Sequence, residues 1–157
     1  MKRYFLKLFE FNAWANQQVL ACLERQSVDD KKILDILGHI LSAQMIWYHR
    51  VAGLPKSPLL LWGEYSLDQL NSMAIEGAAN WLAFTEKEGT FERVLKYHNY
   101  VGNYYENRIE DLMTQLVNHA SYHRGQIAVL LREKGYEPIN TDFVTYDRII
   151  SGQLNDL

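Results

Sequence analysis

The chain has 157 residues, 48% of them hydrophobic and 22% charged, which predicts a single soluble domain over residues 1–157 with a substantial core. Its net charge of −3, with basic residues scattered along the chain, excludes an electrostatic footprint for nucleic acid. No apolar run is long enough to span a membrane, we expect no signal peptide, and the lone Cys22 cannot pair within the chain. These features favour a cytoplasmic protein.

Two helices are predicted in the first third of the chain. Residues 2–25 repeat apolar side chains at helical spacing without glycine or proline, which predicts a helix from about Lys2 to Arg25. A second helix is expected after Ser27 or Asp29, either of which is a good N-cap. It continues to about residue 52, and Gly53 ends it.

A loop and a third helix follow. Residues 53–65 contain two of the three prolines together with Trp62, and an ordered loop of this length is more often functional than idle. Trp62 is the best candidate for a lid. Ser66 is then expected to cap a third helix that runs to about Glu86.

The last third of the chain begins with a different pattern. Residues 90–105 cluster aromatic and β-branched side chains, which predicts a short hairpin or an extended crossover. A fourth helix is expected from Asn107 or Arg108 to Lys134, with a glycine directly after it, and a short final helix after Thr141. The predicted fold is all-α: a four-helix bundle with a long crossover before the fourth helix and a short C-terminal helix.

Three histidines fall on predicted core stripes. His119 and His123 lie four residues apart on the inward face of the fourth helix, and His39 lies on the equivalent stripe of the second. A buried neutral imidazole costs free energy unless its nitrogens find partners, and these stripes carry no acidic residue. A shared metal ion would satisfy all three, and hydrogen-bonded core histidines are the alternative. His49 and His98 are expected either at the surface or next to the metal ligands without binding the metal themselves.

Several familiar catalytic motifs are absent. Ala120 stands where the His-Glu-x-x-His pattern of zinc proteases needs its glutamate. The chain also has no glycine-rich phosphate loop, no nucleophile elbow and no dinucleotide fingerprint. The substrate is therefore a small molecule that the sequence does not name, and the catalytic side chains stay unassigned.

The order and spacing of these residues resemble the DinB-like (YfiT-like) family of metal-binding four-helix bundles over nearly the whole chain. The resemblance is carried by short motifs in four regions: FEFNAWAN at residues 9–16, His39 with Ala43 and Trp47, NHASYHRGQI at residues 118–127, and GYEP at residues 135–138 leading to TDF at residues 141–143.

The resemblance implies one divalent ion, nickel or zinc, held by His39, His119 and His123, with water completing the shell. It also implies a homodimer. The family's better-understood relatives include transferases and isomerases that use low-molecular-weight thiols such as bacillithiol or mycothiol, whereas many DinB-like proteins have no assigned reaction. With three neutral imidazoles, a bound water or thiol would be deprotonated to a nucleophile, as a small hydrolase or a thiol-linked S-transferase requires.

Three functions therefore stay open. A metal-dependent enzyme requires an open coordination position, a non-catalytic metal-binding stress-response protein requires a closed one, and a metal-free helical dimer requires that the protein hold no stoichiometric metal. Side chains that could orient the imidazoles or bind a carboxylate are Asn12, Gln44, Tyr48, Tyr122, Gln126 and Arg124, the last expected to point away from the metal. Basic residues that could lie at a pocket mouth are Arg50, Lys56 and Arg148.

Overall fold

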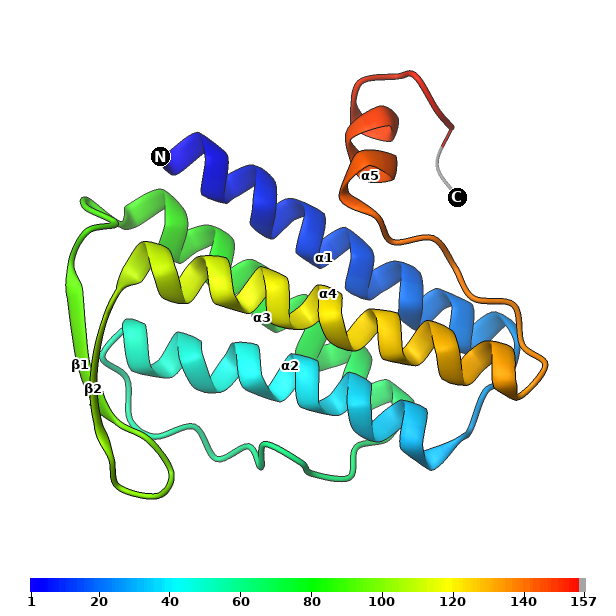
Figure 1. Cartoon of the computed structure of the whole chain (residues 1–157), viewed down its shortest axis with the longest axis horizontal. Helices are drawn as coiled ribbons and strands as arrows, with labels where there is room; N and C mark the ends of the chain where they lie inside the picture. The colour runs from blue at the N-terminus through cyan, green and yellow to red at the C-terminus, as the bar shows by residue number, and fades with distance from the viewer. Residues whose placement is uncertain (156–157) are drawn as a thin grey trace.

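A computed structural model describes residues 1–155 of the chain as a bundle of four long helices (Figure 1). The helices and strands, in chain order, are α1 (Lys2–Arg25), α2 (Lys31–Val51), α3 (Leu67–Lys87), β1 (Val94–His98), β2 (Tyr104–Arg108), α4 (Ile109–Glu133) and α5 (Phe143–Ile150). Both α1 and α2 pack against α3 and α4, and the short α5 packs outside the bundle against α1. The predicted all-α four-helix bundle is confirmed.

The start of α2 differs from the prediction. Its N-cap is Asp30, whose carboxylate accepts a hydrogen bond from the Ile33 amide at 3.1 Å, and not Ser27 or Asp29. Ser27 lies instead in the turn after α1 with a φ of 51°, and Val28 is buried in the core. Because Ser27 and Val28 belong to this turn, α2 begins later than either predicted cap would place it.

The other ends of α2 and α3 follow the predicted signals. Gly53 adopts a positive φ of 68° just beyond the end of α2, a conformation that glycine adopts without strain. Ser66 caps α3 in a capping box, because its hydroxyl accepts from the Gln69 amide while the Gln69 side chain accepts from the Ser66 amide.

The segment before α4 is the hairpin of the two predicted alternatives. Strands β1 and β2 are antiparallel, with Val94 opposite Arg108 and His98 opposite Tyr104. Pairing continues through Arg108, so α4 begins at Ile109, directly after the sheet, and slightly later than predicted. The hairpin crosses one end of the bundle and lies beside the end of α2 (Figure 1).

Two apolar clusters fill the bundle. One surrounds Phe9 and Trp81 near the hairpin, and the other surrounds Leu23 and Leu37 toward the opposite end. Most of the buried polar side chains of the long helices lie around the junction of these clusters: Asn12, Asn16, His39, Ser42, Gln44 and Arg124. The middle of the bundle is therefore its polar layer, and the candidate site lies there.

Within residues 1–155, no helix is both long and apolar enough to cross a membrane.

Candidate metal centre

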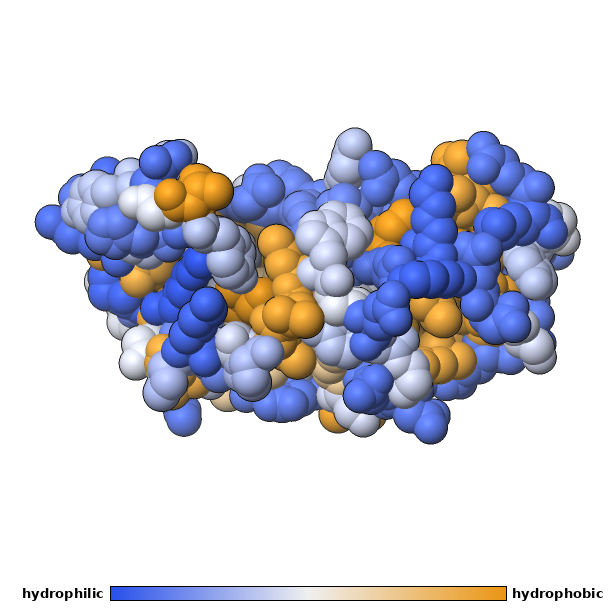
Figure 2. Space-filling model, turned by 90° about the horizontal axis from the view of Figure 1, so that it is seen from below, coloured by the Kyte–Doolittle hydropathy of each residue, from blue (hydrophilic) through white to orange (hydrophobic). Residues whose placement is uncertain are grey.

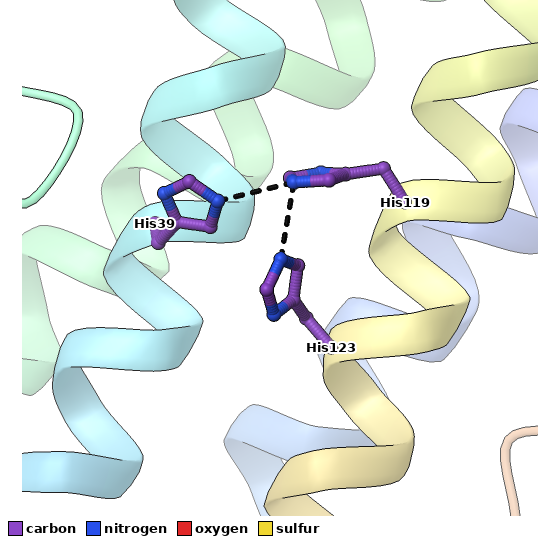
Figure 3. A group of neighbouring side chains, drawn as sticks. All are labelled: His39, His119 and His123. Atoms are coloured by element: carbon purple, nitrogen blue, oxygen red, sulfur yellow. Dashed lines mark hydrogen bonds between the residues drawn. The ribbon is translucent and has the colours of Figure 1, made fainter.

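The three histidines selected from the sequence converge between two helices. His39 projects from α2, and His119 and His123 project from neighbouring turns of α4 toward it (Figure 3). The Nε2 atom of His119 lies 3.0 Å from Nε2 of His39 and 3.1 Å from Nε2 of His123. His39 is buried, and the other two imidazoles are half-buried. Antiparallel packing of two core stripes thus brings together residues 80 positions apart.

The outer nitrogens of two imidazoles have fixed partners. The Nδ1–H of His39 donates to the Leu61 carbonyl at 3.1 Å, and the Nδ1–H of His123 donates to Oε1 of Gln126 at 2.8 Å. Because both acceptors are oxygens, each Nδ1 carries the proton of its neutral ring. The Nε2 atoms of His39 and His123 therefore present lone pairs toward His119.

Hydrogen bonds alone leave this group unsatisfied. A neutral His119 has at most one proton on Nε2, yet two lone pairs face that atom at 3.0 and 3.1 Å. Three imidazoles around a tetrahedral divalent ion, with metal–nitrogen distances near 2.0–2.1 Å, place their nitrogens about 3.3 Å apart. The group could hold a metal ion, since its ligand atoms all lie within 4.8 Å of one another. The donor set fits a borderline-soft divalent cation.

The surroundings favour the uncharged form of two of the imidazoles, those of His119 and His39. Burial, reinforced by the neighbouring imidazoles of His123 and His39, lowers the pKa of His119 to about 4. Burial also lowers the pKa of His39, although its hydrogen bond to Leu61 acts in the opposite direction. The lone pairs of these two rings are consequently available at neutral pH.

The loop between α2 and α3 closes one side of the site. The indole of Trp62 stacks on His39 with ring centroids 3.8 Å apart and planes inclined by 9°. The centroids of the Trp62 and His123 rings are 6.4 Å apart, and their planes are nearly perpendicular. Trp62 is nevertheless 58% exposed, so it lies between the imidazole and solvent. In the described part of the chain the ligand group comprises three imidazoles, with no carboxylate or thiol as a fourth member.

The polar side chains that were expected to orient the imidazoles or bind a carboxylate differ in their surroundings. Gln126 contacts a candidate ligand directly, as described for His123. Tyr122 is 66% exposed, and Tyr48 packs edge-on against Trp81. The buried amide nitrogen of Gln44 has no hydrogen-bond partner among the described residues.

Arg124 points away from the histidines, as predicted. Its guanidinium is buried and donates to the side-chain oxygens of Asn12 at 2.9 Å and Asn16 at 2.8 Å, both on α1. A third hydrogen bond, to the Ser121 hydroxyl, is 3.0 Å long. Burial without a carboxylate partner lowers the pKa of Arg124 to about 10. Arg124 thus joins α4 to α1 and does not reach the ligand group.

The two other histidines lie outside the group. His49 donates from Nδ1 to the Pro55 carbonyl at 2.7 Å, and His98 lies on the hairpin beside Tyr104. Sequence reasoning missed the Leu61 carbonyl, which also accepts a hydrogen bond from the Ser42 hydroxyl at 3.0 Å. Every residue has a backbone carbonyl, so no residue type could have marked this one.

Two comparisons with known proteins bear on the chain as a whole. The model of the DinB family matches residues 1–152. The curated Protein DinB of Bacillus subtilis (strain 168) is 27% identical over 164 residues, an alignment that covers 93% of this chain and 95% of that relative.

Proposed function

This chain belongs to the DinB family, and we propose that it is a metal-dependent enzyme whose divalent ion, nickel or zinc, is held by His39, His119 and His123. One observation carries the proposal: the lone pairs of two imidazoles with fixed tautomers face the Nε2 atom of a third, at distances that hydrogen bonds cannot satisfy together. A cation between them removes this conflict.

The three ligands are neutral, so the bound ion would keep its full charge and supply Lewis-acid chemistry that activates a water or a thiol. The protein's own contribution is to hold and orient the imidazoles. Leu61 and Gln126 set two of the rings, and Trp62 excludes water from the outer face of His39. We propose a thiol-linked S-transferase first, and a small hydrolase second.

The ligand count supports an enzyme over a purely structural metal site. Structural zinc sites are commonly closed by four protein ligands, whereas catalytic sites keep three and leave one position for water or substrate. The group described here has three. A non-catalytic metal-binding protein would need a fourth ligand from outside this group.

Elemental analysis of protein purified without an affinity tag tests the site. We expect about one equivalent of nickel or zinc per chain, and loss of that metal in His119→Ala and His123→Ala. His49→Ala and His98→Ala are matched controls, because both remove a histidine outside the group, and they should retain the metal. Absence of metal from the wild-type protein, or equal retention by all four variants, contradicts the assignment.

An activity screen tests the reaction class. Metal-loaded protein is assayed with a panel of low-molecular-weight thiols against an electrophilic acceptor, and separately with activated esters and amides. Turnover that requires a thiol and disappears in His123→Ala supports the transferase, and thiol-independent ester or amide cleavage supports the hydrolase. Full metal loading without turnover in either series supports the non-catalytic alternative.

We also propose that the protein acts as a homodimer in the cytoplasm. Light scattering on purified protein distinguishes the 18.4 kDa monomer from a particle of twice that mass.

A further inference from the structure

Two adjoining cavities lie between α2, the loop that follows it and the hairpin. The cavity lined by Ala43 and Leu61, here called the inner cavity because it lies nearer to His39 along α2, has a volume of about 250 Å³, and the outer one has a volume of about 420 Å³. They share a wall formed by Ile46, Arg50, Tyr97, Asn99 and Tyr100. Seen from the loop side, hydrophobic side chains border strongly hydrophilic ones toward the hairpin end of the molecule (Figure 2). The cavities form one groove along α2.

The groove is lined by basic side chains without acidic ones. Arg50 and Lys56 line it together with His49 and His98, and none of the residues that line either cavity is acidic. The whole chain has a net charge of −3, so a basic groove is not a consequence of overall composition. Such a surface raises the local concentration of anions.

Arg50 is held in place by aromatic rings and not by an acid. Its guanidinium lies 4.8 Å from the ring centre of Trp47, 5.1 Å from that of Tyr100 and 5.5 Å from that of Tyr97. None of the hydrogen bonds or ion pairs found within residues 1–155 engages this guanidinium. Cation–π contacts order the group but leave its N–H donors free for an anion.

The same stripe of α2 carries Arg50 and His39, one of the three candidate ligands. His39, Ala43, Ile46 and Arg50 follow one another at steps of four, three and four, so they lie on one face of the helix. Ala43 and Leu61 line the inner cavity, and Leu61 is the residue whose carbonyl orients His39. Eleven residues at 1.5 Å each place Arg50 about 16 Å along the helix from His39.

From this arrangement we propose that the groove binds the anionic end of an elongated substrate or cosubstrate, with Arg50 as its anchor and Lys56 as a second cation. This proposal rests on the proposed function, because the other end of the molecule is the one that reaches the metal. The ligand carries a carboxylate or a phosphate about 16 Å from its reacting group, a span estimated from the helix rise. The aromatic walls contact its middle.

The planar fork of arginine suits both anions, because each offers two oxygens to parallel N–H donors. Lys56 adds a point charge without that geometry. Arg50 therefore fixes the orientation of the bound anion, and Lys56 mainly increases the affinity and its dependence on salt.

Anion binding to chelator-treated, metal-free protein tests the proposal. Phenyl phosphate and phenylacetate are titrated separately, with calorimetry or chemical-shift changes as the readout, so that the two arms distinguish phosphate from carboxylate. We expect one of them to bind saturably. Arg50→Gln should weaken that binding by about ten- to a hundredfold, as loss of a charge-assisted bidentate contact predicts. Arg50→Lys should restore part of it.

Arg148→Gln is the matched control, since Arg148 is an exposed arginine on α5 outside the groove, and it should bind as the wild type does. His119→Ala should also bind normally, because the anchor does not depend on the metal. Absence of metal from the wild-type protein, with anion binding intact, would therefore contradict only the proposed function. No saturable binding of either anion, or equal binding by wild type and Arg50→Gln, overturns the anchor.

Discussion

Gln126 offers the sharpest test of how the imidazoles are held. Its Oε1 accepts the Nδ1–H of His123 at 2.8 Å, which keeps the Nε2 lone pair directed at the other two rings. Replacement by methionine preserves side-chain length and helix propensity but removes the acceptor. Loss of such a supporting hydrogen bond typically lowers metal affinity by about 10- to 100-fold, or about 1.4–2.7 kcal/mol.

The assay is competition for Zn²⁺ between the protein and a chromophoric chelator, with Gln126→Met compared with wild type. Gln115→Met is the matched control, because Gln115 is exposed on the same helix and has no part in the cluster. Gln126→Glu should bind zinc at least as tightly as wild type, since a carboxylate is the stronger acceptor. Unchanged affinity in Gln126→Met would refute the idea that this amide positions His123.

Three further predictions concern stability, measured as the free energy of unfolding in urea. Asp30→Ala should cost about 0.5–2 kcal/mol through loss of the α2 N-cap, whereas Asp29→Ala should cost little. The hydrogen bond from Lys134, with the Ile33 amide, lowers the pKa of Asp30 below its ordinary 3.8. Its charge therefore stabilises the fold above pH 3.8, the ordinary pKa, and this contribution is lost as the pH falls through the lowered pKa. Asp30→Asn, which keeps the cap, should differ most from wild type at neutral pH and least at a pH below that lowered pKa. Arg124→Ala should cost about 2–4 kcal/mol because it leaves Asn12 and Asn16 without their donor, and Arg132→Ala, an exposed arginine on the same helix, should be nearly neutral.

The helices were the predictable part of the fold, because apolar side chains at steps of three and four mark a buried face wherever they occur. That same periodicity located His39, His119 and His123, since a histidine in place of an apolar residue on a core stripe is a visible exception. Ser66 was predictable for a similar reason: a strong cap directly precedes an apolar repeat.

The details that stayed open depend on tertiary contacts. Ser27 and Asp29 are both good caps, but Ser27 lies in the turn after α1 and Asp30 is the residue that accepts the Ile33 amide. The choice between hairpin and crossover depended on pairing between Val94 and Arg108, which no local pattern specifies. The basic groove likewise lies between α2 and the hairpin, which are distant in sequence. Arg50 and Lys56 could therefore be named from the sequence as basic candidates, but the sequence did not show which of them lines a pocket.

The stacking of Trp62 on His39 gives the protein an optical reporter at its own metal centre. Trp81, by contrast, is buried in the apolar core, away from solvent. An indole in face-to-face contact with an imidazole at 3.8 Å changes its emission when that ring gains a proton or a metal, and a paramagnetic ion such as nickel quenches it. The difference between wild-type and Trp62→Phe fluorescence therefore follows occupancy of the site in real time, without any label.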